Sequence, residues 1–583
     1  MADSSLDTEA ILKQLFGSAQ QYASDFIRDL PLRDADIAEL NRALLASGPR
    51  RAELARLQQE YVRDWVAIMQ GQNVEAAATA DRRFSAPEWR KLAWFRTMRD
   101  LYELNARYVN AVTAAAELPP AAHRRVQFFT RQLTDAMSPS NFPQTNPEAI
   151  TRAFETRGES ITRGAQAFAD DLARRRISMT DESQFEVGRN LAITPGDVVY
   201  ENELIQLIQY RPTTRRVRAR PLLIVPPFIN KYYILDLQPE NSFVAYCVDQ
   251  GISTFIISWR NIRDELGHLT WDDYIDKGIF QAIDVIRSIY RTDGINTLGY
   301  CVGGTLLACA LAVMAARNVR GIASLTLLAS MLDFTDTGDI SAYVDETYVQ
   351  RCEQRFAKHG VVPGSQLANA FASLRANELV WYFVVNNYLL GQSPRAFDLL
   401  YWNADGANLP GPLFSYYLRN MYLENRLRLP GALHMHGVPV DLGRIHLPSM
   451  VIATREDHIV PWESAYRGTQ LLGGDTEFIL GASGHVAGIV NPARGNRRHY
   501  WTNIAGQQPA APQHWFDKAQ QADGSWWPYW MKWLLRHSGR TVAARKTTGS
   551  TQFRPIEPAP GRYVRERGDL SVSSRTADQL SLF

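Results

Sequence analysis

Cysteine is scarce in this sequence. Only four cysteines occur in 583 residues, and none forms a C-x-x-C pair with partners at metal-ligand spacing. We therefore expect neither a disulfide framework nor a structural zinc site, and a reducing cytoplasm is the compartment that fits best. No resident metal or cofactor is predicted.

Long apolar runs and long blocks of one charge are also missing. The longest strongly apolar run, Leu306–Ala316, is about half of the ~20 residues that a membrane-spanning helix needs. Lysine and arginine total 63 against 61 acidic residues, without a long basic block. We expect no membrane span and no nucleic-acid partner. The N-terminal stretch MADSSLDTEAILKQLF lacks the layout of a secretory signal.

What remains is ordinary globular composition, with 45% apolar and 21% charged residues. At ~100–200 residues per domain the length suggests two to four domains. Residues 1–190 read as a helical N-terminal domain, because apolar residues recur every three or four positions over residues 51–70. Ser85, followed by Pro87 and Glu88, predicts the start of a helix.

From residue 191 the pattern changes to short β-rich apolar runs that alternate with helical stretches. Such alternation predicts a mostly parallel sheet flanked by helices. The six runs are 221–227, 252–259, 295–300, 322–330, 449–457 and 477–485. Residues of about 331–447, rich in aromatic side chains and asparagine, interrupt the alternation and are interpreted as a cap over the active site; an immobile helical layer is the alternative. Residues from about 540 to 583 are expected to form an extended C-terminal arm of this 191–583 domain.

The stretch LGYCVGGTLL, residues 298–307, carries the main chemical signal. Cys301 stands between Gly299 and Gly303, directly after a β-rich run and before a helical one. This arrangement is typical of the sharp turn that presents the nucleophile in the α/β-hydrolase fold, where the flanking positions must be small. The N-terminus of the following helix would stabilise a thiolate. We therefore predict that Cys301 is the catalytic nucleophile and assign the α/β-hydrolase fold.

A cysteine nucleophile needs a base, and the order in this fold is nucleophile, acid, histidine. Asp457 ends one predicted strand and His485 ends the next, so both should project at the same edge of the sheet as Cys301. We predict His485 as the base and Asp457 as its carboxylate partner. His458, next to the aspartate, is assigned a possible supporting role, with an ordinary loop position as the alternative.

The tetrahedral intermediate of acyl transfer needs hydrogen-bond donors. One should be the backbone N–H of Val302, directly after the nucleophile. The other should come from the loop after the first predicted strand, for which we choose Ile229, with Asn230 as a possible supporting residue. The prolines that precede this loop also suit a rigid turn, and both interpretations can hold together.

A thiol at the nucleophile position favours a particular reaction. If cysteine takes an acyl group from a thioester, the new bond resembles the broken one, so the acyl group stays activated. That acyl-enzyme can still form an ester with an alcohol, whereas an acyl-serine would already be a stable ester. The sequence therefore favours acyl transfer from a coenzyme A donor to a hydroxyl group over plain hydrolysis.

Several long motifs in the same order resemble the class I polyhydroxyalkanoate synthases. They include PPFINKYYILDLQPENS, GISTFIISWRN, LGYCVGGT, LLYWNADGANLPGP, REDHIVPW, LGASGHVAGIVNP and DGSWWPYW. The resemblance covers nearly the whole chain, and the nucleophile, base and carboxylate of the family fall on Cys301, His485 and Asp457. In the family the carboxylate either orients the histidine or helps to activate the substrate hydroxyl, and the sequence does not decide between these roles.

The resemblance implies an enzyme that polymerises (R)-3-hydroxyacyl-coenzyme A, with short-chain 3-hydroxybutyryl units expected, and releases coenzyme A. The coenzyme A thioester would be the substrate, not a cofactor. The resemblance also implies a cytoplasmic homodimer that stays on the surface of the polyester granule with the growing chain. Two alternatives remain: a polyester depolymerase or acyl-coenzyme A thioesterase with the same three residues, and a granule-binding structural protein with a vestigial site.

Overall fold

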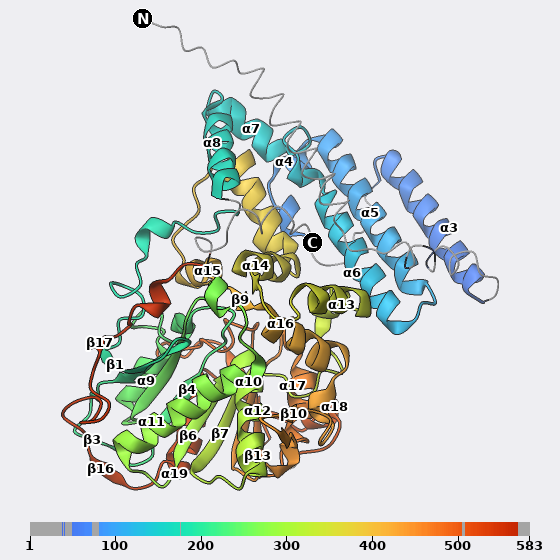
Figure 1. Ribbon diagram of the computed structural model, residues 1–583. Coiled ribbons are helices and arrows are strands. Elements are labelled where there is room, and N and C mark those ends of the chain that lie inside the picture. Colours follow the sequence, from blue (N-terminus) through green and yellow to red (C-terminus); the bar gives the residue numbers. More distant parts are fainter. Residues whose placement is uncertain are drawn as a thin grey trace, which may run out of the picture. The chain divides into compact units, whose positions relative to one another are not determined.

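The computed structural model divides the chain into two compact units (Figure 1). The first unit comprises Met1–Asp181, Asn369–Ala396 and Arg575–Phe583, and the second comprises Glu182–Ala368 and Phe397–Ser574. The structure describes residues 36, 38, 40, 49–72, 81–174, 176–503 and 508–568. The N-terminal stretch MADSSLDTEAILKQLF and the serine-rich end of the predicted arm lie outside these residues. None of the described helices is both long enough and apolar enough to cross a bilayer.

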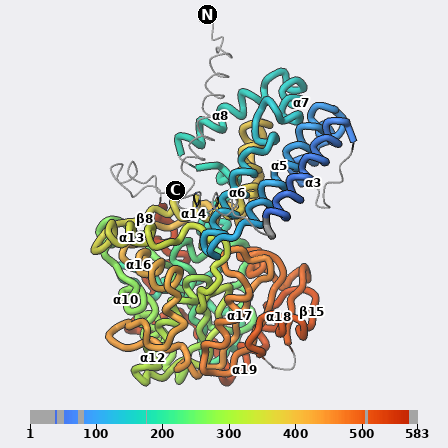
Figure 2. Tube along the Cα trace, turned by 90° about the vertical axis from the view of Figure 1, so that its right-hand side faces the viewer, coloured from blue at the N-terminus to red at the C-terminus, as the bar shows by residue number. Residues whose placement is uncertain are grey.

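The described part of the first unit is helical, which confirms the predicted helical N-terminal region. Figure 2 shows α3, α5 and α6 lying side by side as three rods. The helices are α3 (Pro49–Met69), α4 (Glu88–Lys91), α5 (Ala93–Ala115), α6 (Pro120–Ala136), α7 (Pro147–Glu155) and α8 (Glu159–Arg174).

The expected helix start at Ser85 is wrong. Ser85 instead ends a 3-10 turn, Arg82–Phe84, whose start is capped by the side chain of Asp81. Helix α4 begins at Glu88 after Pro87, and no side-chain hydrogen bond caps it. Asp81, not Ser85, therefore provides the N-terminal cap in this stretch, and it caps the turn that precedes α4.

Part of the segment predicted as a cap belongs to the first unit. Gln132 on α6 donates a hydrogen bond to the carbonyl of Ser373 at 2.7 Å. The hydroxyl of Tyr388 donates to the Asp171 carboxylate on α8, also at 2.7 Å. Residues 369–396, which include two π-helical turns (Asn377–Trp381 and Val384–Leu389), are therefore packed with the N-terminal helices.

The second unit is built on one eleven-stranded sheet in the order β15-β14-β13-β12-β7-β6-β4-β5-β2-β1-β17. Its six neighbouring strands from β13 to β5 are parallel, and the strands at both edges are antiparallel. The strands are β1 (Gly196–Glu201), β2 (Ile205–Tyr210), β4 (Leu222–Val225), β5 (Thr254–Trp259), β6 (Ile295–Tyr300), β7 (Ile322–Leu328), β12 (Ser449–Thr454), β13 (Thr476–Gly481), β14 (His499–Thr502), β15 (Gln520–Asp523) and β17 (Glu557–Pro558).

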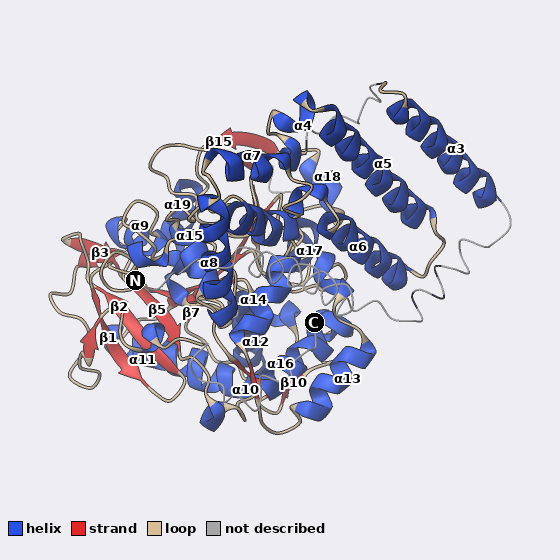
Figure 3. Ribbon diagram, turned by 90° about the horizontal axis from the view of Figure 1, so that it is seen from above, coloured by secondary structure: helices blue, strands red, loops and turns tan. Residues whose placement is uncertain are grey.

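The six parallel strands are the six predicted from the sequence, so the α/β-hydrolase type of sheet is confirmed. They are mostly apolar because helices cover both faces, as Figure 3 shows. Leu223 and Val225 of β4 face one core, and Leu222 and Ile224 face the other. The first core includes α10 (Trp271–Asp273), α11 (Gln281–Tyr290) and α12 (Val302–Ala316), and the second includes α9 (Phe243–Asp249) and α19 (Trp527–His537).

Shorter elements complete the second unit. The loop regions contribute α13 (Glu346–Arg355), α14 (Gly364–Ser373, which continues into the first unit), α15 (Asp398–Ala404), α16 (Gly411–Tyr417), α17 (Trp462–Thr469) and α18 (Pro512–Phe516). Three small two-stranded sheets pair β8 (Val361–Val362) with β9 (Leu409–Pro410), β10 (His434–Met435) with β11 (Val438–Pro439), and β16 (Thr541–Ala543) with β3 (Arg216–Arg218). Both β16 and β17 lie in the predicted C-terminal arm.

Candidate active site

Cys301 occupies the sharp turn between β6 and α12. Its backbone has φ 53° and ψ −130°, a conformation that residues other than glycine rarely adopt. Its N–H donates to the carbonyl of Leu328 at 2.9 Å. A Cβ on Gly299 would lie 2.3 Å from the Cα of Gly304. A Cβ on Gly303 would lie 2.4 Å from the carbonyl oxygen of Pro226. The two glycines that flank the turn are therefore required sterically, as the sequence predicted.

Asp457 and His485 meet at the carboxyl ends of β12 and β13. Nδ1 of His485 lies 2.7 Å from Oδ2 of Asp457, and Thr454 donates to the same oxygen at 3.3 Å. The other carboxylate oxygen accepts the backbone N–H groups of Ile459 and Val460 at 2.9 and 2.8 Å. The protein thus supplies four hydrogen bonds to the carboxylate, and Nε2 of the imidazole stays available for Cys301.

The environment of His485 favours the charged imidazole. Burial by itself would lower its pKa, but the Asp457 carboxylate and Cys301, both hydrogen-bonded to the ring, raise the pKa of His485 to about 10. The ring of Tyr300 stacks on the imidazole with centroids 5.5 Å apart. The structure therefore brings Cys301, His485 and Asp457 into one hydrogen-bonded chain, as we expected from their positions after parallel strands.

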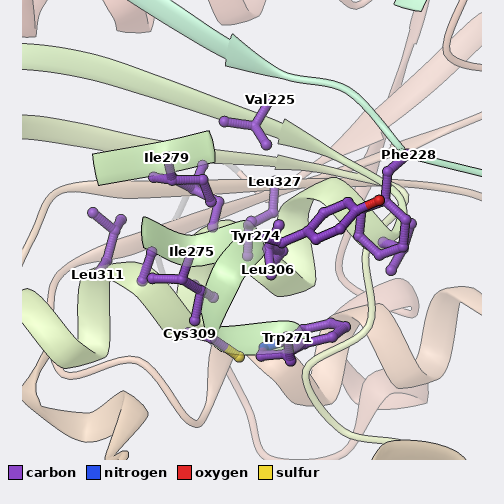
Figure 4. Packing of buried hydrophobic residues seen from close by; sticks show 14 of the residues in the cluster. Val225, Phe228, Trp271, Tyr274, Ile275, Ile279, Leu306, Cys309, Leu311 and Leu327 are labelled. Carbon is purple, nitrogen blue, oxygen red and sulfur yellow. The ribbon is translucent and has the colours of Figure 1, made fainter. Parts of the chain in front are cut away.

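Cys301 is also the accessible cysteine. It is half-buried, whereas Cys247, Cys309 and Cys352 are buried. Figure 4 shows Cys309 on α12 packed against the indole of Trp271 in the first core. Burial raises the pKa of Cys309 to about 12, so that thiol stays protonated at neutral pH. Cys301 is the cysteine whose environment suits a nucleophile.

The two proposed donors to the intermediate lie on neighbouring segments. Val302 is the first residue of α12, where backbone N–H groups have no partner within the helix. Ile229 lies in the loop after β4, and the close approach of Gly303 to Pro226 shows that this loop packs against the start of α12. This arrangement supports the prediction for Val302 and Ile229, and their role stays a prediction.

The two residues assigned possible supporting roles are placed differently. Asn230 forms an isolated antiparallel bridge with Gly406, so it links the β4 loop to the segment before β9. His458 is half-buried, and its carbonyl oxygen packs closely against Gly338. Their predicted roles in the reaction remain predictions.

Two tyrosines that our sequence analysis did not single out also reach the site. Tyr417 ends α16, and Tyr422 lies in the π-helical turn Leu418–Leu423 that follows. Burial raises the pKa of both phenols, and the nearby Cys301 raises it further. Their rings are 5.2 Å apart, and each contacts Phe334. The aromatic richness of residues 331–447 was the signal, but it did not identify these two tyrosines.

Within the described ranges, no group of three or more histidine, cysteine, aspartate or glutamate side chains is arranged to hold a metal ion. The site contains a thiol, an imidazole, a buried carboxylate and two nearby phenols. Such a set can transfer an acyl group through a covalent thioester.

Comparison with known proteins agrees with this geometry. Residues 80–247 match the family model described as Poly-beta-hydroxybutyrate polymerase (PhaC) N-terminus, and residues 220–492 match the alpha/beta hydrolase fold. The chain is 48% identical over 525 residues to the poly(3-hydroxyalkanoate) polymerase subunit PhaC of Cupriavidus necator, covering 88% of this chain and 89% of that protein. It is 41% identical to the PhaC subunit of Rhizobium meliloti, covering 86% and 82%. A third relative, the poly(3-hydroxyalkanoate) polymerase of Methylorubrum extorquens, is 40% identical, covering 88% and 86%.

Proposed function

The chain belongs to the poly(3-hydroxyalkanoate) polymerase family, and we propose that it polymerises (R)-3-hydroxyacyl-coenzyme A through an acyl-cysteine at Cys301. Short-chain 3-hydroxybutyryl units are the proposed monomer. The observation that carries the proposal is the Cys301–His485–Asp457 chain at the edge of the parallel sheet.

In the first step the Cys301 thiolate attacks the thioester carbonyl carbon. Charge develops on the carbonyl oxygen, where the N–H groups of Val302 and Ile229 are the proposed donors. The carbon–sulfur bond to coenzyme A then breaks, and the imidazolium of His485 gives its proton to the departing thiolate. The products are free coenzyme A and a thioester on Cys301.

In the second step the hydroxyl group of another hydroxyacyl unit attacks this thioester. His485, now neutral, takes the hydroxyl proton, the new ester bond forms and the Cys301 thiolate leaves. The atoms balance without water, so each ester bond made corresponds to one coenzyme A released.

We propose that Asp457 acts by orienting His485. Its carboxylate already accepts four hydrogen bonds, from His485, Thr454 and the N–H groups of Ile459 and Val460. A substrate hydroxyl would have to displace one of these partners to reach it. This saturation favours the orienting role over direct activation of the hydroxyl.

Assembly as a homodimer, residence in the cytoplasm and association with the polyester granule complete the proposal and rest on family membership. Light scattering of the purified protein with and without substrate would test the dimer. Fluorescence microscopy of a tagged chain in polymer-forming cells would test the location. A signal spread evenly through cells that contain granules would contradict association with the granule.

The main experiment incubates the purified protein with 3-hydroxybutyryl-coenzyme A and measures free thiol, insoluble polyester and soluble hydroxy acid together. We expect coenzyme A release that matches the polyester formed. Soluble hydroxy acid as the main product would instead support a thioesterase or depolymerase. Absence of free thiol, polyester and hydroxy acid with the wild-type protein would support a structural protein with a vestigial site, and unchanged activity in Cys301→Ala would reject Cys301 as the nucleophile.

A further inference from the structure

The loop that follows β4, residues 226–231, is held firmly at its beginning. Trp259 Nε1 donates a hydrogen bond to the carbonyl of Pro226 at 2.9 Å. The buried ring of Phe228 makes edge contacts with Trp259, Trp271 and Tyr274, with centroids 6.1, 6.2 and 5.1 Å apart. Close packing of this kind leaves the first half of the loop little freedom.

The second half of the loop, which carries Ile229, depends on hydrogen bonds instead. The N–H of Ala407 donates to the carbonyl of Ile229 at 3.0 Å. Trp402 Nε1, on α15, donates to the carbonyl of Lys231 at 2.7 Å. Both bonds fix carbonyl groups of the loop, and the side chain of Lys231 makes a further contact from the loop's end.

Lys231 is an unusual residue for this position. Its side chain is buried, with 2% of the residue exposed, although lysine is among the residues least often buried. Nζ donates to the backbone carbonyl of Glu566 at 2.5 Å, a contact between residues 335 positions apart. A charged side chain therefore joins the β4 loop to the C-terminal segment 557–568, which we call the strap.

The strap is itself anchored to the second unit. It begins with β17, which pairs with β1. The further hydrogen bonds that hold it include Tyr563 Oη to the carbonyl of Asn202 at 2.8 Å, Asn261 Nδ2 to the carbonyl of Arg567 at 3.2 Å, and Asn408 Nδ2 to the carbonyl of Gly568 at 3.0 Å. A carbonyl on a segment anchored in this way can serve as a fixed point for the Lys231 ammonium.

We infer that Lys231 is a positioning residue for acylation, which holds the Ile229 N–H toward the carbonyl oxygen of the thioester by anchoring the β4 loop to the strap. This inference rests on the proposed function, because it assigns Lys231 to the same acylation step. The chemistry offers a selective test. Attack on a thioester places charge on the carbonyl oxygen, whereas alkylation of a thiol by iodoacetamide displaces iodide at a saturated carbon and needs no such donor.

The experiment measures two rates for each variant. The first is single-turnover acylation of Cys301 by 3-hydroxybutyryl-coenzyme A, followed by mass spectrometry of the intact protein. The second is alkylation of Cys301 by iodoacetamide. The variants are Lys231→Met, which keeps the length of the stem, Lys231→Arg, which keeps a donor, and Trp402→Phe, which removes the second hydrogen bond. Tyr102→Phe, which removes a hydrogen bond from a tyrosine to the backbone carbonyl of Thr134 in the first unit, is the matched control.

We expect Lys231→Met and Trp402→Phe to slow acylation by roughly tenfold or more while alkylation stays within about twofold of wild type. Lys231→Arg should recover part of the acylation rate, and Tyr102→Phe should resemble wild type in both rates. If Lys231→Met fails to fold, Trp402→Phe carries the test.

Two results would overturn the inference about Lys231 alone: normal acylation in a folded Lys231→Met, or an equal fall in acylation and alkylation. The second result would mean that the site is disordered generally. Failure of wild-type Cys301 to become acylated, with normal alkylation, would instead reject the proposed function and the inference with it.

Discussion

His485 and Asp457 are joined by a 2.7 Å hydrogen bond in which the aspartate side chain is completely buried and the histidine side chain is 8% exposed. A buried carboxylate attracts the imidazole by its charge and fixes the orientation of the ring by the hydrogen bond, because few other groups can compete for it. The four hydrogen bonds to Asp457 make it a fixed support for the imidazole.

Asp457→Asn should therefore reduce first acylation and chain elongation by similar factors. The amide keeps the shape but loses the charge that stabilises the imidazolium, and a loss of roughly 10²- to 10⁴-fold is expected from comparable catalytic triads. Single-turnover acylation measured beside steady-state polymerisation checks this. A loss confined to elongation would show that the carboxylate acts on the substrate hydroxyl.

Cys301→Ser should lose most polymerisation, by at least roughly 100-fold. The hydroxyl is a poorer nucleophile than the thiolate, and the ester that it forms is a poorer acyl donor than a thioester. Polymer yield and coenzyme A release should be compared with those of Cys301→Ala, which sets the background. Near-normal polymer from the serine variant would refute the thioester argument.

The raised pKa of His485 predicts a pH dependence of stability. In the native state His485 has a pKa of about 10, whereas in the unfolded chain its pKa is near 6.5. The stabilisation is thus fully present below pH 6.5 and is lost as the pH rises through about 10, with a slope of at most roughly 1.4 kcal/mol per pH unit. Denaturant titrations between these pH values should show a shallower decline in the free energy of unfolding for His485→Gln. Parallel curves for the two proteins would contradict the raised pKa.

Gly303→Ala should damage both stability and acylation. The new Cβ would lie 2.4 Å from the carbonyl oxygen of Pro226, so α12 and the β4 loop would have to move apart, at a cost of about 1–3 kcal/mol. Gly468→Ala on α17 is the control, because its Cβ would lie 3.4 Å from the nearest atom, the Cβ of Leu332. Thermal unfolding and acylation rates compare the two, and equal behaviour would rule out the steric explanation.

Prediction from the sequence succeeded where the signal was local. The run INTLGY is β-rich, bounded on both sides and followed by a helical pattern, and it forms β6 over the predicted residues. Prediction failed at Ser85, where a neighbouring residue decided the cap, and it did not find Tyr417 or Tyr422. Their approach to Cys301 depends on how residues 409–423 pack, which no local periodicity encodes.

The sequence by itself determined the order of strands and helices around Cys301, because periodicity and steric limits at glycine act over a few residues. It also placed Asp457 and His485 at strand ends, since parallel strands share one carboxyl edge. Only the tertiary structure decided which atoms meet there and which distant segments support them. The side chain of Lys231 donates a hydrogen bond to the backbone carbonyl of Glu566. Every residue has such a carbonyl, so no pattern of residue types can reveal this partner.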